Sequence, residues 1–281
     1  RIKAAAMPST PVVPADPDTP AMPLIQTEPV QHLRVVTYNI HKGVQGMWPL
    51  RRLEIHNLQQ AIADLQADVI CLQEVRKLNR QAERIFANWP RQPQADYLAP
   101  NGYHSVYISS AITAHGEHGN ALLSRWPVVQ HQHQDISDHR FEQRGLLHSI
   151  INVQGVLVHV IVVHLGLMGT SRLRQALQLR HFIEREVPAH APLLVAGDFN
   201  DWSQKLHGVF ADSGLHSETA ASFSTFPARL PLTQLDHIYA RGLHRVRQFV
   251  PGQIHLPERP DIYNWASLSD HLPLVAEFAL D

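Results

Sequence analysis

The chain contains the stretch Leu193-Leu194-Val195-Ala196-Gly197-Asp198-Phe199-Asn200, in which strand-forming apolar residues end in a carboxylate and a carboxamide. Side chains at positions i and i+2 of a strand lie on the same face. Asp198 and Asn200 can therefore point together into one cleft while Phe199 packs away from it. The pattern predicts a buried strand whose end carries an acid and an amide that share one ligand.

The same order, an apolar run followed by a polar end, recurs at 35–39, 68–74, 160–164 and 235–239. Together these ends offer hard oxygen ligands with no pair of cysteines and no cage of histidines, which is the chemistry that Mg²⁺ or Mn²⁺ prefers. The sequence therefore predicts a metal site that handles phosphate. Its candidate oxygen donors are Asn39, Glu74, Asp198, Asn200, Asp236 and Asp270.

Stretches of helical periodicity lie between the apolar runs. One helix is predicted within 50–66 and another within 171–186, where Pro188 follows the end. The apolar positions expected to face the core are Leu58, Ile62 and Leu65 in the first helix, and Leu173, Leu177 and Phe182 or Ile183 in the second.

Further strands are predicted at 119–123, 145–153 and 155–165, and around Val195, Ile238 and Val275. Strands that interleave with few helices and include hairpins are typical of an α/β protein with two mixed sheets. We predict a four-layer sandwich in which two mixed β-sheets pack face to face and helices flank them.

The N-terminal region differs in composition from the rest. Its prolines keep a three-residue phase with one omission, which matches the three residues per turn of polyproline II. We expect residues 1–30 to be a flexible leader and residues 31–281 to form the folded domain. The leader either docks a partner or acts as a tether without one. The prolines are Pro8, Pro11, Pro14, Pro17, Pro20, Pro23 and Pro29.

Composition limits the classes of function. The 281 residues are 44% hydrophobic, enough for one large core, and the formal net charge of −1 gives no broad positive field for a polynucleotide. The single cysteine, Cys71, is expected to be buried. No apolar run approaches the ~20 residues that span a bilayer, so we expect a soluble domain and favour the cytoplasm, although composition leaves the compartment open. His131 and His133 are expected in a solvated loop.

Seven polar motifs follow one another along residues 33–280. They are Thr37-Tyr38-Asn39-Ile40-His41, Leu72-Gln73-Glu74-Val75, Gly119-Asn120-Ala121-Leu122-Leu123-Ser124, Val163-His164-Leu165, Gly197-Asp198-Phe199-Asn200, Leu235-Asp236-His237-Ile238-Tyr239 and Ser269-Asp270-His271. In this order they resemble the endonuclease/exonuclease/phosphatase superfamily. Within it the chain looks most like a compact bacterial branch of unassigned substrate, and the resemblance implies a DNase I-like fold.

The resemblance also implies roles for these residues. Glu74, assisted by Asn39 and Asp270, would bind Mg²⁺ or Mn²⁺. Asp198 and Asn200 would position and help deprotonate the attacking water, His164 would bind the phosphoryl oxygens, and Asp236 would orient His271. The general base is either Asp198 or His271.

Three features of the motifs leave alternatives open. Many relatives carry an acid where this chain has His41, so no direct role is implied for that ring. In the run Glu142-Gln143-Arg144-Gly145, either Glu142 orients His164 or Arg144 meets phosphate. Asn120 either serves the site or satisfies backbone groups.

Other residues can be interpreted in two ways. Trp202, Phe223 and Phe226 line a pocket or close the core, and the core is favoured. Four arginines form an anion-binding rim or are separately solvated; they are Arg140, Arg144, Arg172 and Arg174.

The predicted function is metal-dependent hydrolysis of a phosphodiester by in-line attack of an activated water. The alternatives are a nuclease that acts on DNA or RNA, a phospholipid or sphingomyelin-type phosphodiesterase, and a catalytically inactive binding module. The expected partner is a phosphate-ester substrate, with nucleic acid and phospholipid both open. The only protein partner considered is one that docks on the proline-rich leader.

Overall fold

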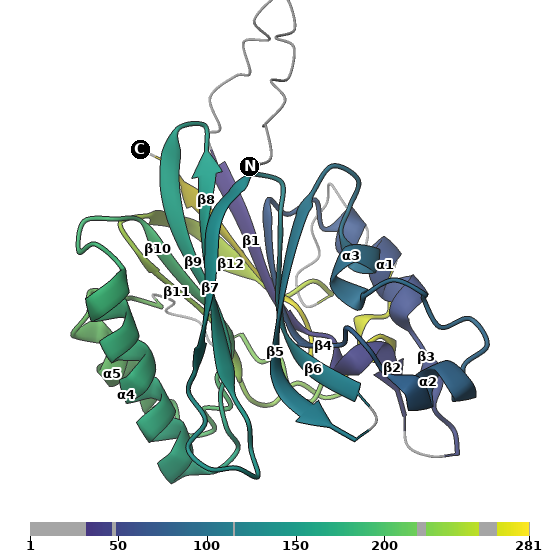
Figure 1. Cartoon of the computed structure of the whole chain (residues 1–281). Helices are drawn as coiled ribbons and strands as arrows, with labels where there is room; N and C mark the ends of the chain where they lie inside the picture. Colours follow the sequence, from purple (N-terminus) through teal and green to yellow (C-terminus); the bar gives the residue numbers. More distant parts are fainter. Residues whose placement is uncertain (1–31, 47–48, 115, 218–222, 253–262, 281) are drawn as a thin grey trace, which may run out of the picture.

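Two β-sheets lie face to face, with helices on the outer face of each (Figure 1). The computed structural model describes residues 32–46, 49–114, 116–217, 223–252 and 263–280. The proline-rich leader lies outside the described residues, so its boundary at residue 30 stays a prediction. The four layers that the sequence predicts are confirmed.

The first sheet has six strands in the order β12-β13-β1-β4-β6-β5. β1 and β4 run parallel and the other neighbours run antiparallel, so the sheet is mixed. The bounds are β1 His32–Asn39, β4 Val69–Val75, β5 His104–Thr113, β6 Gly116–Ser124, β12 His244–Phe249 and β13 Leu274–Ala279.

The second sheet has five strands in the order β11-β10-β9-β8-β7 and is also mixed, because β9 and β10 are parallel. A short pair, β2 Val44–Gln45 and β3 Arg52–Leu53, stands apart. The bounds of the second sheet are β7 Val128–Asp135, β8 Gly145–Val153, β9 Val156–His164, β10 Leu193–Asp198 and β11 Asp236–Arg241.

Helices α1, α2 and α3 lie beside the first sheet, and α4 and α5 lie beside the second (Figure 1). Their bounds are α1 Ile55–Asp64, α2 Arg80–Ile85, α3 Gln94–Leu98, α4 Gly169–Glu186 and α5 Leu206–Ala211, with 3-10 turns at His41–Gly43 and Trp265–Ser267. No helix in the described part of the chain combines the length and the apolar character needed to cross a bilayer.

Strands β8 to β11 of the second sheet are largely buried on both faces, which explains their apolar runs. In β10, Leu194 and Ala196 join the core between the sheets, whereas Leu193 and Val195 join the core under α4 and α5. Such double burial is typical of strands covered on two sides. Position 197 requires glycine, because a Cβ there would lie 1.9 Å from the Val163 carbonyl oxygen of β9.

The prediction that two leucines of α4 face the core is wrong. Leu173 and Leu177 are exposed, while Ala176, Leu179, Phe182 and Ile183 are buried. The reason is that the helix buries polar residues near its start. The Arg172 guanidinium donates to the carbonyls of Gly166 and Leu167, and Gln175 accepts from the Gly166 N–H.

Two smaller predictions also change. The helix in 50–66 begins only at Ile55, because Arg52–Leu53 forms β3. His131 and His133 are exposed as predicted, but they lie on β7 and not in a loop. β7 is an edge strand, which tolerates polar residues. Cys71 is fully buried as predicted, and burial raises the pKa of its thiol.

Candidate active site

Three neighbouring strands place polar side chains at one edge of the second sheet. β9 ends at His164, β10 ends at Asp198 and β11 begins at Asp236. The register pairs Asp198 with His164 on one side and with Asp236 on the other. From the facing sheet, the Asn39 amide at the end of β1 donates to Asp198 Oδ2 at 3.1 Å. The two sheets therefore meet at Asp198.

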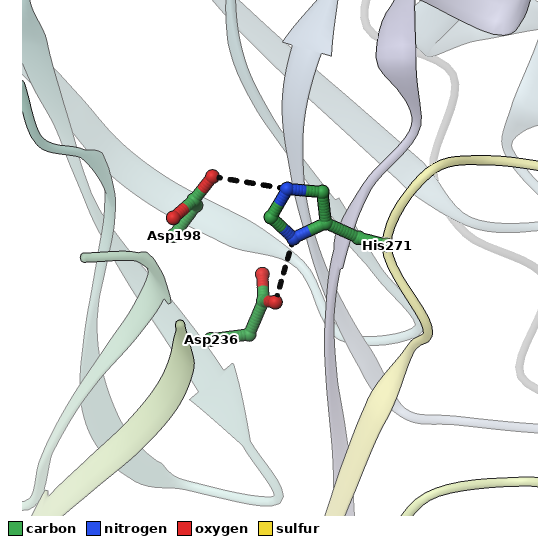
Figure 2. Close-up of side chains that lie close together, drawn as sticks. All are labelled: Asp198, Asp236 and His271. Carbon is green, nitrogen blue, oxygen red and sulfur yellow. Dashed lines mark hydrogen bonds and ion pairs between the residues drawn. The ribbon is translucent and has the colours of Figure 1, made fainter. Parts of the chain in front are cut away.

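His271 lies between two buried carboxylates (Figure 2). Its Nδ1 is 2.8 Å from Asp236 Oδ2, and its Nε2 is 3.6 Å from Asp198 Oδ2. Thr225 Oγ1 also donates to Asp236 Oδ2, at 2.6 Å. Burial opposes the charged ring, but Asp236 and Asp198 outweigh it and raise the pKa of His271 to about 10. His271 is therefore a protonated ring in a fixed orientation.

Asp198 and Asn200 are held by the backbone around them. Asp198 Oδ1 accepts the Asn200 N–H at 2.9 Å, and the Asn200 amide donates to the Leu165 carbonyl at 2.9 Å. Burial raises the pKa of Asp198, although His271 and His164 oppose this effect. Phe199 packs away from the site, edge-to-face against Phe210, as the strand pattern predicts.

His164 is also directed at Asp198, with its Nε2 3.5 Å from Asp198 Oδ2. Burial and the nearby Arg144 charge lower the pKa of His164 to about 4, despite the opposing carboxylates of Asp198 and Glu74. The ring is therefore neutral at neutral pH. The site holds one charged and one neutral imidazole, both within reach of the same carboxylate oxygen.

Glu142 binds Arg144 and the backbone of the loop that follows His164. Its Oε1 is 3.2 Å from an Arg144 guanidinium nitrogen and accepts the Leu167 N–H at 3.0 Å. No hydrogen bond joins Glu142 to His164 within the described residues. The role of Glu142 in orienting His164 stays a prediction, and the contacts that Glu142 makes are with Arg144 and with the loop that follows His164. The Arg144 Nε is buried without a hydrogen-bond partner.

The predicted metal ligands Glu74 and Asp270 each face a basic side chain. Lys42 Nζ is 2.7 Å from Glu74 Oε2, and His41 Nδ1 is 3.3 Å from Asp270 Oδ1. Burial opposes ionisation of Glu74, but Lys42 holds the pKa of this carboxyl well below its usual range. The pKa of Asp270 is also lowered, chiefly by His41 and against the effect of burial.

Left-handed backbone is concentrated at this edge. Glu74, Asn200, His41 and Lys42 have φ values of 56°, 49°, 44° and 62°. Non-glycine residues adopt this region at a cost that the surrounding structure must offset, and such residues gather at functional sites. The left-handed backbone conformations therefore occur at the same edge of the sheets as the candidate site side chains.

Two groups of side chains are candidates to hold a divalent ion. Single ligand atoms of Asp198, Asp236 and His271 lie within 4.8 Å of one another. Both nitrogens of His271 face carboxylates, at 2.8 and 3.6 Å, so that group is already held together as a chain of ion pairs. Glu74, Asp270 and Asn39 supply hard oxygens instead, and these suit Mg²⁺ or Mn²⁺.

The sequence profile of the Endonuclease/Exonuclease/phosphatase family matches residues 36–271, which include every candidate site residue. The chain belongs to the endonuclease/exonuclease/phosphatase family. "Uncharacterized protein YbhP" of Escherichia coli strain K12 is 35% identical over 258 residues, which cover 88% of this chain and 96% of that protein. Membership of the family is thus shown, whereas this relative's name assigns no substrate.

Solved structures of the family share the fold. An endonuclease/exonuclease/phosphatase from Beutenbergia cavernae superposes with a TM-score of 0.67 at 21% identity, over 89% of this chain and 72% of that one. The human Nocturnin catalytic domain, solved with a bound sulfate anion, gives 0.64 at 22% identity, over 90% and 95%. The mannosyl-6-phosphatase Bt3783 of Bacteroides thetaiotaomicron gives 0.64 at 18%, over 88% and 100%.

Three residues of this family site were not assigned roles from the sequence. Lys42 pairs with Glu74, and Thr225 binds Asp236. His118 is the third, because burial and the Lys42 charge lower its pKa to about 4. Lys42 and His118 lie next to the motifs and Thr225 lies outside them, and only tertiary contacts show what each one touches.

Asn120 and the aromatic residues take definite places. The Asn120 amide donates to the carbonyls of Gly145 and Val162 on the opposite sheet, at 2.8 and 3.4 Å, which supports its structural reading. Trp202 is half exposed and contacts Phe226, whose ring centroid is 4.9 Å from that of His271. The preference for the core is therefore wrong for Trp202, whereas Phe223 packs on the core between the sheets.

The four arginines do not form one rim. Arg172 is buried against the 166–167 loop, and Arg174 pairs with Asp138 at 2.6 Å. The Arg140 guanidinium lies over the Phe141 ring. Arg144 alone of the four acts electrostatically on His164.

Proposed function

We propose that the protein is a divalent-metal-dependent phosphoesterase that hydrolyses a phosphodiester by in-line attack of an activated water. The observation that carries the proposal is the chain of contacts from Asp236 through His271 to Asp198, beside the carboxylates of Glu74 and Asp270. The family's description names endonucleases, exonucleases and phosphatases, which are enzymes that hydrolyse phosphate esters.

Glu74, Asn39 and Asp270 would hold the ion. Their oxygens fit a hard divalent cation. The two carboxylates form ion pairs with Lys42 and His41, basic groups that a doubly charged ion can outcompete. When bound, Mg²⁺ or Mn²⁺ supplies a Lewis acid that neutralises charge on a phosphate oxygen.

The chain's own side chains would perform the remaining tasks. His271, protonated and oriented by Asp236, donates from Nε2 to a phosphoryl oxygen as negative charge builds. Asp198, fixed through its other oxygen by the Asn200 N–H, orients the attacking water and accepts its proton. The neutral His164 ring and the Arg144 guanidinium bind further phosphoryl oxygens. We propose Asp198 as the base rather than His271, because the two carboxylates beside the His271 ring favour its protonated form.

The test uses bis-p-nitrophenyl phosphate with Mg²⁺ or Mn²⁺. We expect hydrolysis by the wild type and a loss of at least about a thousandfold in kcat for Asp198→Ala and His271→Ala. Asp212→Ala is the matched control, because Asp212 is exposed and its carboxylate pairs with Arg180 of α4 and with no candidate site residue. Circular dichroism checks that each variant is folded. Equal hydrolysis by all four proteins contradicts the proposal.

A further inference from the structure

Large apolar side chains are concentrated on the loops around the candidate site. Among the described residues sixteen large hydrophobic side chains are exposed, and seven of them lie on these loops. Phe141, Leu50 and Leu232 expose 83%, 81% and 70% of their surface. The seven are Leu50, Phe141, Leu167, Met168, Trp202, Leu230 and Leu232. Exposed apolar groups gathered in this way mark an interaction surface.

Contacts place these loops around the catalytic centre on both sides. One open groove of about 980 Å³ is lined by Leu50, Arg51, Arg229 and Asp270. The loop that contains Leu50 and the turn at 227–232 therefore flank Asp270, a candidate metal ligand. On this side too, the Leu232 N–H donates to the Phe226 carbonyl, next to His271.

On the His164 side, Glu142 joins two further loops. Phe141 precedes it, and its carboxylate accepts the Leu167 N–H. Residues 166–168 follow directly from the end of β9 at His164. The apolar side chains of Phe141, Leu167 and Met168 therefore border the same centre.

Arginines accompany the exposed apolar residues in three of the loops. Leu50 is followed by Arg51, Phe141 is preceded by Arg140, and Leu230 is preceded by Arg229. In the described residues none of these three guanidiniums has a carboxylate partner. The two acids close to Phe141 in the sequence are already paired, Asp138 with Arg174 and Glu142 with Arg144.

We propose that this edge of the molecule docks on the surface of a lipid bilayer that contains anionic lipids. Leu50, Phe141, Leu230 and Leu232 enter the boundary between headgroups and acyl chains, and Arg51, Arg140 and Arg229 face the anionic headgroups. The site then opens onto the membrane, so its phosphoester is one that a lipid headgroup presents. The docking proposal depends only on the exposed residues of these loops. The proposal of a lipid phosphoester as substrate rests in addition on the proposed function.

The first experiment measures sedimentation of the full-length protein with vesicles. One set is phosphatidylcholine alone, and the other contains equal parts of phosphatidylcholine and phosphatidylglycerol. We expect binding to the anionic vesicles that weakens as salt is raised. Each arginine adds about fivefold to binding at an anionic surface, so Arg140→Gln with Arg229→Gln should weaken it by more than about tenfold. Equal binding to both sets, or to neither, overturns the proposal.

A triple variant tests the apolar part: Phe141→Ser, Leu230→Ser and Leu232→Ser together should lower vesicle binding by at least about tenfold. The matched control changes Val156, Leu157 and Val246 to Ser, since these exposed apolar residues belong to β9 and β12 and not to the loops around the site. A triple variant that binds like this control overturns the proposal. So does a wild type that forms a dimer lost in the triple variant, because the face would then be covered by a second copy.

Docking and chemistry can be separated. Asp198→Ala should bind anionic vesicles as the wild type does, and the triple variant should keep its rate on bis-p-nitrophenyl phosphate while losing hydrolysis of phosphatidylglycerol in vesicles. If no phosphoester is cleaved but the vesicles still bind, the proposed function fails and docking stands. If the diester in free solution is cleaved but vesicles do not bind, docking fails alone.

Discussion

At the scale of single residues, the candidate metal ligands form ion pairs with basic side chains, and a divalent ion would replace these basic partners. Lys42 Nζ neutralises Glu74 at 2.7 Å, and its own backbone has φ of 62°, in the left-handed region. Arg76 lies nearby, where burial and the Arg51 charge lower its pKa to about 10. The region around Glu74 is therefore already rich in positive charge.

Lys42→Met should strengthen the binding of a divalent ion. Removing the ammonium from Glu74 removes a competing cation, and we expect the dissociation constant for Mn²⁺ to fall by roughly tenfold. Isothermal titration calorimetry measures this change. The matched control is Lys77→Met, an exposed lysine just beyond β4. Weaker or unchanged Mn²⁺ binding in Lys42→Met would show that Lys42 does not compete for Glu74.

Residue types at the site could be predicted from the sequence, but several contacts could not. The period of two in a strand is local information and predicts Asp198 and Asn200 on one face, but β10 ends at Asp198 and Asn200 has a left-handed backbone with φ of 49°. The partner of Glu142 depends on how the 166–167 loop folds over α4, and that is set by Arg172 and Gln175 far along the chain. Lys42 reaches Glu74 only through a 3-10 turn whose backbone no periodicity predicts.

At the scale of elements, β8 and β9 are joined by two buried histidines. His148 Nε2 is 2.9 Å from His159 Nδ1, and Gln132 donates to His148 Nδ1 at 3.1 Å. With the Gln132 amide as donor, His148 carries its proton on Nε2 and donates it to His159. Burial and the neighbouring His159 lower the pKa of His148 to about 4, and burial also lowers that of His159.

This pair predicts a loss of stability in acid. The pKa of His148 is about 6.5 in the unfolded chain and about 4 in the folded protein. Between these two pH values the unfolded chain binds the proton and the folded protein does not. The contribution of His148 to stability is therefore present above about pH 6.5 and is lost as the pH falls toward about 4. His148→Gln should reduce the loss between about pH 7 and pH 4.5 by on the order of 2 kcal/mol, as measured by urea unfolding. His131→Gln, on the exposed face of β7, should leave the loss unchanged; equal pH profiles for both variants would contradict this account.

Asn120 connects the two sheets, since its amide on β6 binds carbonyls of β8 and β9. Asn120→Ala leaves both buried carbonyls without this donor, and we expect unfolding to become easier by about 1–3 kcal/mol. Urea denaturation measures the change. Asn57→Ala on α1, whose side chain binds only the nearby Glu54, serves as control. A loss no larger than that of the control would mean that Asn120 does not fasten the sheets.

Elements could be predicted unevenly for the same reason. Strands buried on both faces, such as β9 and β10, can be recognised in the sequence as apolar runs, without knowledge of the elements that pack against them. The orientation of α4 could not be predicted, because its buried face includes Arg172 and Gln175, whose polar groups are satisfied by a loop outside the helix.

At the scale of the whole molecule, the fold brings chemistry together by closing two mixed sheets on each other. Strand ends from both sheets lie at one edge, and their side chains are separated along the chain by up to 232 positions, from Asn39 to His271. Motif order and strand pattern predicted the sandwich, whereas the exposed apolar loops at its edge were not predicted, because exposure is a property of the folded surface alone.

The most direct measurement of the central claim is the dependence of bis-p-nitrophenyl phosphate hydrolysis on Mn²⁺ concentration after removal of divalent ions with a chelator. The account predicts no activity without metal and saturable activation of the wild type by Mn²⁺. Glu184→Gln is the control, since Glu184 is an exposed glutamate on α4, and it should behave as the wild type does. Glu74→Gln should need at least about a tenfold higher Mn²⁺ concentration. Full activity after chelation, or identical Mn²⁺ curves for Glu74→Gln and wild type, would contradict it.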